Sequence, residues 1–170
     1  MDPSPTEVSN AAIPAKTVQD HKPCRVFCSY SHRDRAFRQR LENHLQIFVR
    51  NGLIETWHDR KLSAGDDWRG KIDANLDGAE LILLLVSADF LASDYCYDVE
   101  MKRALERHNN NKARVVPIIL KPAQWRDTPL AELQVLPVGA RPVTEWPNRD
   151  LAFNSIAEEL RDIVLQMRTV

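Results

Sequence analysis

The chain of 170 residues carries 23 basic and 24 acidic side chains, for a net charge of -1. This length fits one domain with a five-stranded α/β core but not two domains. The balanced charge argues against a nucleic-acid partner, which requires a clustered basic surface. The longest apolar run, residues 81–86, is too short to cross a bilayer, and no secretory signal follows Met1. We therefore expect a cytoplasmic protein without a membrane partner.

The first 22 residues differ in composition from the rest of the chain. They are polar, contain three prolines and lack aromatic side chains, so they cannot bury enough apolar surface to become ordered. We expect a disordered N-terminal tail over residues 1–22, either a linker from a preceding segment or a free end. The folded domain is expected to occupy residues 23–170.

From Arg25 onward, short apolar runs alternate with amphipathic helical stretches. The runs predict strands at residues 26–30, 53–57, 81–86 and 115–120, with a possible short fifth strand at Arg141-Pro142-Val143. Helical spacing predicts helices over residues 37–48, 68–79, 93–108 and 153–167. The first is expected to stop at Asn51-Gly52 and the third at residues 109–111, because Gly and Asn tolerate a left-handed cap. This alternation predicts a parallel sheet with helices on both faces.

The motifs of several common sites are missing. No Gly-x-Gly-x-x-Gly, Gly-Lys-Ser/Thr or Gly-x-Ser-x-Gly sequence occurs, which argues against a bound dinucleotide cofactor, a phosphate loop and a hydrolase elbow. The three cysteines, Cys24, Cys28 and Cys96, lack Cys-x-x-Cys spacing, and the histidines are scattered. We expect reduced thiols, no metal and no bound cofactor.

Four segments in order carry a family resemblance. They are Val26-Phe27-Cys28-Ser29-Tyr30-Ser31 with Asp34, the loop 59–65, the region from Ile82 to Glu100, and Val116-Pro117-Ile118-Ile119-Leu120. Together they resemble the first box, the BB loop, the third strand with helix αC, and the fourth strand of Toll/interleukin-1 receptor (TIR) domains. The similarity is greatest to the bacterial, NAD-cleaving branch. Two positions depart from the family pattern: Ala64 replaces the usual proline, and Glu100 lies five residues after Tyr95 instead of four after a tryptophan.

The resemblance implies a flavodoxin-like, five-stranded parallel sheet of order 2-1-3-4-5 with helices on both faces. In such sheets a ligand lies beyond the carboxyl ends of strands one and three, where the winding reverses. Enzymatic TIR domains cleave the bond between nicotinamide and ribose in NAD+ with one glutamate on αC, so the resemblance makes Glu100 the catalytic residue. NAD+ would then be the substrate.

Helical geometry separates the two acidic residues of that segment. At about 100° per residue, Asp98 and Glu100 lie roughly 160° apart on opposite edges of an apolar face through Tyr97 and Met101. They cannot serve one site together, and Asp98 remains the alternative catalytic residue. A structural interpretation is also open, in which Glu100 forms an ion pair with Arg103 or Arg107 on a solvated surface.

The predicted substrate-binding residues surround the ends of the first three strands. Tyr30, Ser31, His32 and Arg33 could bind the pyrophosphate at a helix start, or could simply cap that helix. Trp57 could stack on a base or belong to the core, and Ser87 lies at the tip of the third strand. An assembly loop that gates the pocket or docks a second copy is expected at Arg60, Leu62, Ala64, Gly65 and Asp66.

Two functions remain open at the level of sequence. The first is a TIR-domain NAD+ glycohydrolase that releases nicotinamide and linear or cyclic ADP-ribose after self-assembly in immune defence. The second is a non-catalytic TIR scaffold or adaptor that acts through homotypic contacts. Both imply other TIR domains as partners, and the acidic residue at Glu100 favours the enzyme.

Overall fold

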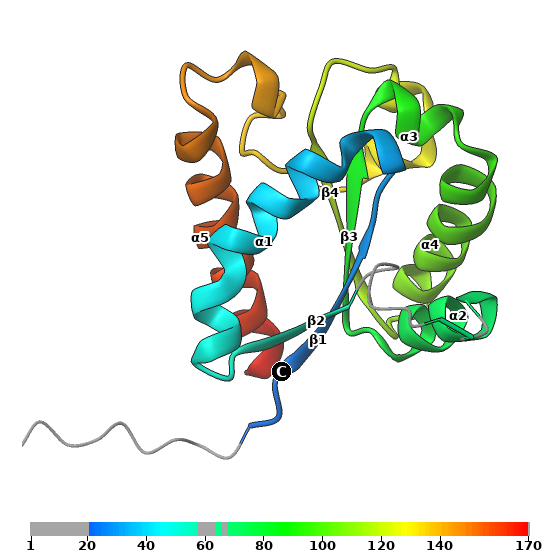
Figure 1. Ribbon diagram of the computed structural model, residues 1–170, viewed down its shortest axis with the longest axis vertical. Coiled ribbons are helices and arrows are strands. Elements are labelled where there is room, and N and C mark those ends of the chain that lie inside the picture. Colours follow the sequence, from blue (N-terminus) through cyan, green and yellow to red (C-terminus); the bar gives the residue numbers. More distant parts are fainter. Residues whose placement is uncertain (1–20, 58–63, 66–67, 170) are drawn as a thin grey trace, which may run out of the picture.

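The computed structural model describes residues 21–57, 64–65 and 68–169. Its centre is a parallel sheet of four strands in the order β2-β1-β3-β4 (Figure 1). The strands are β1 (Cys24–Ser29), β2 (Ile54–Trp57), β3 (Leu81–Val86) and β4 (Arg114–Ile119). The α/β class and the order of these four strands agree with the prediction. The predicted tail, residues 1–22, lies almost wholly outside the described residues.

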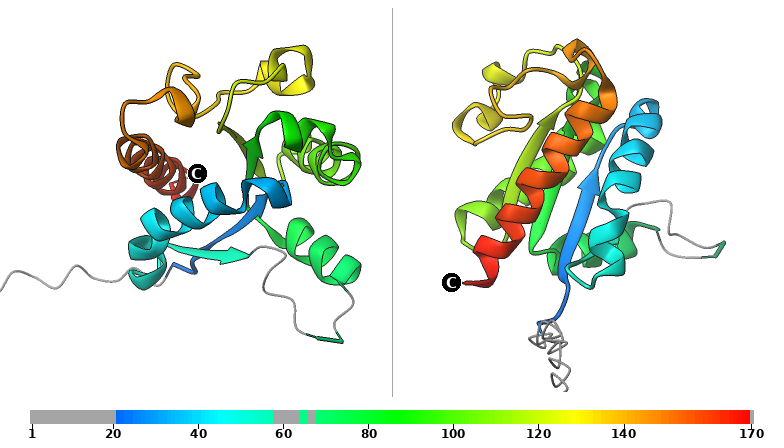
Figure 2. Two further views of the ribbon diagram at one scale, coloured as in Figure 1. Left: turned by 45° about the horizontal axis from the view of Figure 1, so that its top comes forward. Right: turned by 90° about the vertical axis from the view of Figure 1, so that its left-hand side faces the viewer.

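Helices cover both faces of the sheet, as Figures 1 and 2 show. One face packs against α1 (Arg35–Arg50) and α5 (Arg149–Arg168). The other face packs against α2 (Trp68–Gly78), α3 (Ala88–Ala92), the π-helix η3 (Tyr95–Met101) and α4 (Lys102–Asn109). Short 3-10 helices complete the chain at η1 (His32–Asp34), η4 (Trp125–Asp127), η5 (Pro129–Glu132) and η6 (Val143–Glu145).

Strand β3 is the centre of the core, because all six of its residues are buried. Side chains alternate along a strand, so Leu81, Leu83 and Leu85 pack toward α1 and α5. The intervening Ile82, Leu84 and Val86 pack toward α2, η3 and α4. A strand that is apolar on both faces belongs between two helical layers, which explains the uninterrupted apolar run in the sequence.

The predicted fifth strand at residues 141–143 is wrong. In the described part of the chain Val143 begins the 3-10 helix η6 instead. The edge of β4 is met by a single residue, Leu136, whose N–H donates to Pro117 O at 2.9 Å and whose O accepts from Ile119 N at 2.8 Å. The chain turns directly after Leu136, where Ala140 N donates to Pro137 O at 2.9 Å, and the pairing stays an isolated bridge. Pro117 is tolerated in β4 because β4 has only this isolated contact at its outer edge.

The third predicted helix, residues 93–108, is divided. The structure has a separate short helix α3 before it, then the π-helix η3, then α4. The wider π turn changes which residues face the core: Cys96 and Glu100 are buried, whereas Tyr97 is only half-buried. The predicted helix ends are confirmed, since Gly52 (φ 71) follows α1 and Asn111 (φ 57) follows α4 with left-handed backbones.

Candidate functional site

The carboxyl ends of β1 and β3 meet at one edge of the sheet, beside the start of α1 and α3 (Figure 1). β1 runs directly into η1 and α1, and β3 runs into α3 and η3. The connections leave these two neighbouring strands toward opposite faces of the sheet, which is where open α/β sheets bind ligands. Most of the predicted site residues lie around this edge.

A fully buried carboxylate holds this edge together. Asp34 is 0% exposed; one of its oxygens accepts a hydrogen bond from Ser87 Oγ and the other lies 2.8 Å from Lys121 Nζ. Ser87 Oγ also accepts from Phe90 N at 3.1 Å and so caps α3. We call Asp34, Ser87 and Lys121 the Asp34 cluster. The sequence analysis named Asp34 only with the first box of the resemblance and missed Lys121, because 87 residues separate the two in the chain.

Glu100 is a second buried carboxylate. Its residue is 6% exposed and lies within η3. Cys96, one turn earlier, donates from Sγ to Tyr30 O at 3.6 Å, which ties η3 to the end of β1. Ionised side chains are rarely buried without a specific reason, and single π-helical turns inside helices are frequent at functional sites. Both the buried carboxylate and the π-helical turn make η3 a candidate for a functional role.

Asp98 lies on the opposite side of η3. Its side chain is 53% exposed and its carboxylate lies 3.4 Å from Lys102 Nζ. Glu100 and Asp98 therefore occupy different environments, one buried and one in solvent. An exposed ion pair at this spacing contributes little to stability. Of these two carboxylates, Glu100 is the one that faces the interior.

Glu100 does not lie on a solvated surface, because it is buried; its ion pair with Arg103 or Arg107 stays an open interpretation. Arg103 binds Asp77 of α2 through two guanidinium nitrogens. Arg107 Nη1 donates to Leu76 O at 2.7 Å and to Ala79 O at 2.6 Å. The two arginines thereby fasten the end of α2 to α4.

The predicted tryptophan lies on the same face of the sheet as η3. Trp57 is half-buried and stacks on Phe27, with ring centroids 5.4 Å apart and planes at 15°. Phe27 is in the core cluster that contains Cys96 and Met101 of η3. The indole is thus held flat by packing, which suits either a core role or a stacking surface.

The four residues after β1 differ in exposure. Tyr30 is 6% exposed, with the Arg38 guanidinium 5.4 Å from its ring centroid. Ser31 caps η1, because its Oγ accepts from Arg33 N at 3.4 Å. His32 and Arg33 are exposed, and Arg33 Nε lies 3.9 Å from Asp89. Of these four residues, His32 and Arg33 are therefore the two whose side chains are exposed.

The predicted assembly loop is described at two residues only. Ala64 and Gly65 are exposed, and Gly65 has a φ of 86. Arg60, Leu62 and Asp66 lie outside the described residues. There is room for a side chain at position 65, since a Cβ there would meet nothing within 4 Å. The positive φ of Gly65, however, is a backbone conformation that other residues rarely adopt.

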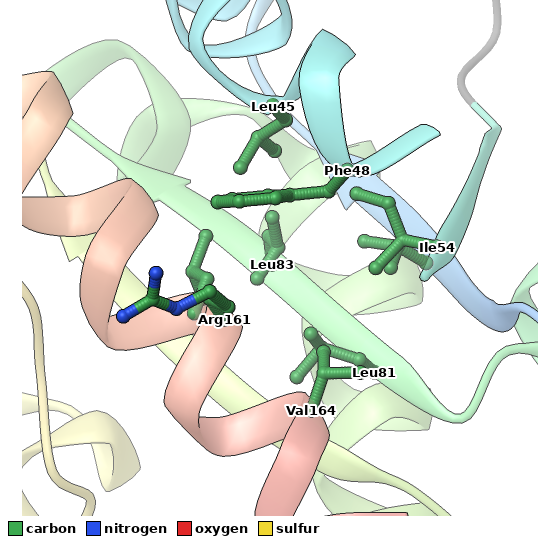
Figure 3. Close-up of a pocket in the computed structure, with 9 residues that line it drawn as sticks. Leu45, Phe48, Ile54, Leu81, Leu83, Arg161 and Val164 are labelled. Carbon is green, nitrogen blue, oxygen red and sulfur yellow. The ribbon is translucent and has the colours of Figure 1, made fainter. Parts of the chain in front are cut away.

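An apolar cavity beneath α1 and α5 is separate from this edge (Figure 3). Leu45, Phe48, Leu83 and Val164 are among the side chains that line it, and Arg161 is the one charged lining residue. It is a small packing gap between helices and sheet, with too few polar groups to orient a substrate. Across the residues with described positions, no three His, Cys, Asp or Glu side chains gather as metal ligands, and no helix has the length and apolarity to span a membrane.

Comparison with known proteins gives the family. Residues 26–153 match the sequence family described as TIR domain, and the chain belongs to that family. An uncharacterized protein of Sinorhizobium fredii, y4lF, is 49% identical over 137 residues, which cover 81% of this chain and 42% of that protein. The chain thus spans less than half the length of this relative.

Two solved structures share the fold. The TIR domain of the Toll-related receptor TRR-2 from Hydra magnipapillata has a TM-score of 0.56 and 20% identity, covering 82% of this chain and 98% of that one. The TIR domains in the activated Roq1 resistosome, which recognises the effector XopQ, have a TM-score of 0.50 and 18% identity, covering 81% and 83%.

Removing the cation of the Asp34 cluster should destabilise the fold. Lys121→Met leaves the carboxylate of Asp34 buried without its counter-charge, so we expect a loss of about 2 kcal/mol or more in the free energy of unfolding. Asp34→Asn/Lys121→Met should recover part of that loss, because the unpaired charge is gone. Urea denaturation of the three proteins measures this. Equal stability of wild type and Lys121→Met would contradict a structural role for the pair.

The contact between α2 and α4 should weaken in acid. The hydrogen bond from Arg103 lowers the pKa of Asp77 below its ordinary value of 3.8. A depressed folded-state pKa stabilises the fold above 3.8, and this contribution is lost as the pH falls through the lowered value. The carboxylate is partly exposed, so the effect is small. Asp77→Asn should therefore lower the Tm slightly at pH 7 and by progressively less as the pH falls below 3.8; a deficit of constant size over that range would contradict this.

Proposed function

We propose that this TIR domain is an NAD+ glycohydrolase with Glu100 as its catalytic residue. The observation that carries the proposal is the buried carboxylate of Glu100, 6% exposed, on a π-helical turn that contacts the residue after β1. A carboxylate withdrawn from water interacts more strongly with a developing positive charge than one in solvent does. NAD+ cleavage develops such a charge on the ribose.

The reaction breaks the bond between the ribose C1′ and the nicotinamide nitrogen. The bonding electron pair leaves with nicotinamide, which departs neutral, and the ribose acquires oxocarbenium character, as in glycoside hydrolysis. Glu100 accepts hydrogen bonds from the ribose hydroxyls and stabilises that positive charge. Water then attacks C1′ and gives up a proton, which yields ADP-ribose; attack by an adenine nitrogen of the same molecule would yield the cyclic product.

Neighbouring residues supply plausible contacts for the rest of the substrate. Trp57 offers a half-buried ring face on the same side of the sheet as Glu100, suited to stacking on a base. Arg33 is an exposed cation at the start of η1 and can approach the pyrophosphate. This chemistry requires no second carboxylate, because the leaving group already carries positive charge and needs no general acid.

Self-assembly is the second part of the proposal. The Roq1 TIR domains were solved in an activated resistosome, and we infer that copies of this chain likewise associate through TIR contacts, in cytoplasmic immune defence. The loop around Gly65 would then complete the pocket of a neighbouring copy. A scaffold that assembles without cleaving NAD+ is the competing function.

Glu100→Gln tests the catalytic assignment. Gln preserves the shape of the side chain and removes its charge, so nicotinamide release should fall about 100-fold or more. Asp98→Asn is the matched control, since it removes a neighbouring carboxylate that is exposed, and it should retain near wild-type rates. Nicotinamide is measured by chromatography at high protein concentration, with circular dichroism to check folding. No release by the wild type would leave the scaffold as the function.

Gly65→Val tests the loop. Its Cβ meets no neighbour, so the fold should be unaffected, but a β-branched residue disfavours the positive φ. We expect the rate to rise with protein concentration for wild type and much less steeply for Gly65→Val. Ala64→Val is the control. It introduces the same side chain at the adjacent exposed position, where the backbone does not have a positive φ, and should behave as wild type. Identical concentration dependence in all three proteins would remove the loop from the assembly.

A further inference from the structure

Ser29 carries a buried hydroxyl that the fold does not use. It is the last residue of β1 and is 1% exposed. Within the described part of the chain, its Oγ has no hydrogen-bond partner. Buried hydroxyl groups are almost always hydrogen-bonded, and an exception in a folded protein calls for an explanation, such as a role in catalysis or binding.

The pleat of β1 directs this hydroxyl toward η3. Side chains two residues apart on a strand share a face, so Ser29 points to the same side as Phe27, which packs in one core cluster with Cys96. The register agrees, because Ser29 pairs with Leu84 and Leu84 belongs to that cluster. Ser29 therefore lies on the sheet face that η3 covers, and Glu100 lies on η3 itself.

A hydrogen bond brings the two elements together at this point. Tyr30, the residue after Ser29, accepts a hydrogen bond from Cys96 Sγ through its carbonyl, at 3.6 Å. Cys96 is one turn before Glu100 on η3. The unbonded hydroxyl and the buried carboxylate thus flank the same junction between β1 and η3.

A second buried serine supplies the contrast. Ser87 directly follows the neighbouring strand β3 and, at 0% exposed, is as deeply buried as Ser29. Its hydroxyl, however, donates to Asp34 and accepts from Phe90 N. Burial at the sheet edge does not by itself leave a serine unbonded, so the state of Ser29 is a property of its particular location.

We propose that Ser29 is a substrate-binding residue whose Oγ hydrogen-bonds a ribose hydroxyl of NAD+ alongside Glu100. This inference rests on the proposed function and adds a residue to that site. A serine hydroxyl both donates and accepts, so it can pair with a ribose hydroxyl that donates to the carboxylate. Because Ser29 is covered in this structure, the contact forms only when the side chains above it separate on substrate binding.

Ser29→Ala separates this role from a structural one. Deleting an unbonded hydroxyl removes no internal hydrogen bond, so the Tm should stay within about 2 °C of wild type or rise. Ser87→Ala, the matched control for stability, should lower the Tm by several degrees because it strips a partner from Asp34. In nicotinamide-release assays, Ser29→Ala should lose about 3- to 10-fold in kcat/KM, the usual effect of one neutral hydrogen bond.

NAD+ binding gives a readout that does not depend on cleavage. Isothermal titration calorimetry compares Glu100→Gln with Glu100→Gln/Ser29→Ala, and we expect the Kd for NAD+ to rise about 3- to 10-fold in the double variant. If wild type releases no nicotinamide but this difference in Kd appears, hydrolysis fails and the assignment of Ser29 stands. If wild type is active and Ser29→Ala matches it in kcat/KM and Kd, the assignment of Ser29 fails alone. An inactive wild type together with no NAD+ binding by Glu100→Gln and by the double variant overturns both.

Discussion

The burial of the Asp34 carboxylate is the constraint on which the rest of the site depends. An ionised carboxylate removed from water is tolerated only where its oxygens are paired. Those of Asp34 are taken by Ser87 Oγ and by Lys121 Nζ. These three residues follow β1, β3 and β4 in turn. One buried charge therefore holds the carboxyl ends of three strands together, and with them every segment that leaves that edge.

The position of Glu100 follows from this anchor. Ser87 both binds Asp34 and caps α3, and α3 leads directly into η3. The contact of Cys96 with Tyr30 O then seats η3 against β1. On the far side, Arg107 binds the carbonyls at the end of α2 and keeps α4 in place. The segments before and after Glu100 in the chain, α3 and α4, are thus both held in place. A preorganised electrostatic site requires such support.

The contrast between the two buried carboxylates is chemical. Asp34 has a cation within 2.8 Å and a hydroxyl donor, so its charge is committed to the fold. Glu100 lies on η3, which the contact of Cys96 with Tyr30 O joins to the end of β1.

Much of the fold could be predicted from local patterns. The apolar run 81–86 identified the central strand, and Asn51-Gly52 marked the end of α1, because burial and backbone preference are properties of short segments. The predicted strand at 141–143 failed, since a strand exists only if a neighbour can pair with it, and the chain meets β4 only in the isolated bridge at Leu136 before it turns away. The predicted regular helix at 93–108 missed the π turn, because a helical wheel assumes one period throughout.

The sequence by itself determined the family resemblance, which rests on residue type and spacing, and the resemblance implied the order of four strands and singled out Glu100. The tertiary structure alone decided that Glu100 is buried and Asp98 exposed, that Lys121 neutralises Asp34, and that Ser29 Oγ, unlike Ser87 Oγ, has no hydrogen-bond partner among the described residues. The physical reason is that burial and pairing depend on which distant segments meet. That meeting is fixed by packing the whole chain around the sheet, and no stretch of sequence encodes it on its own.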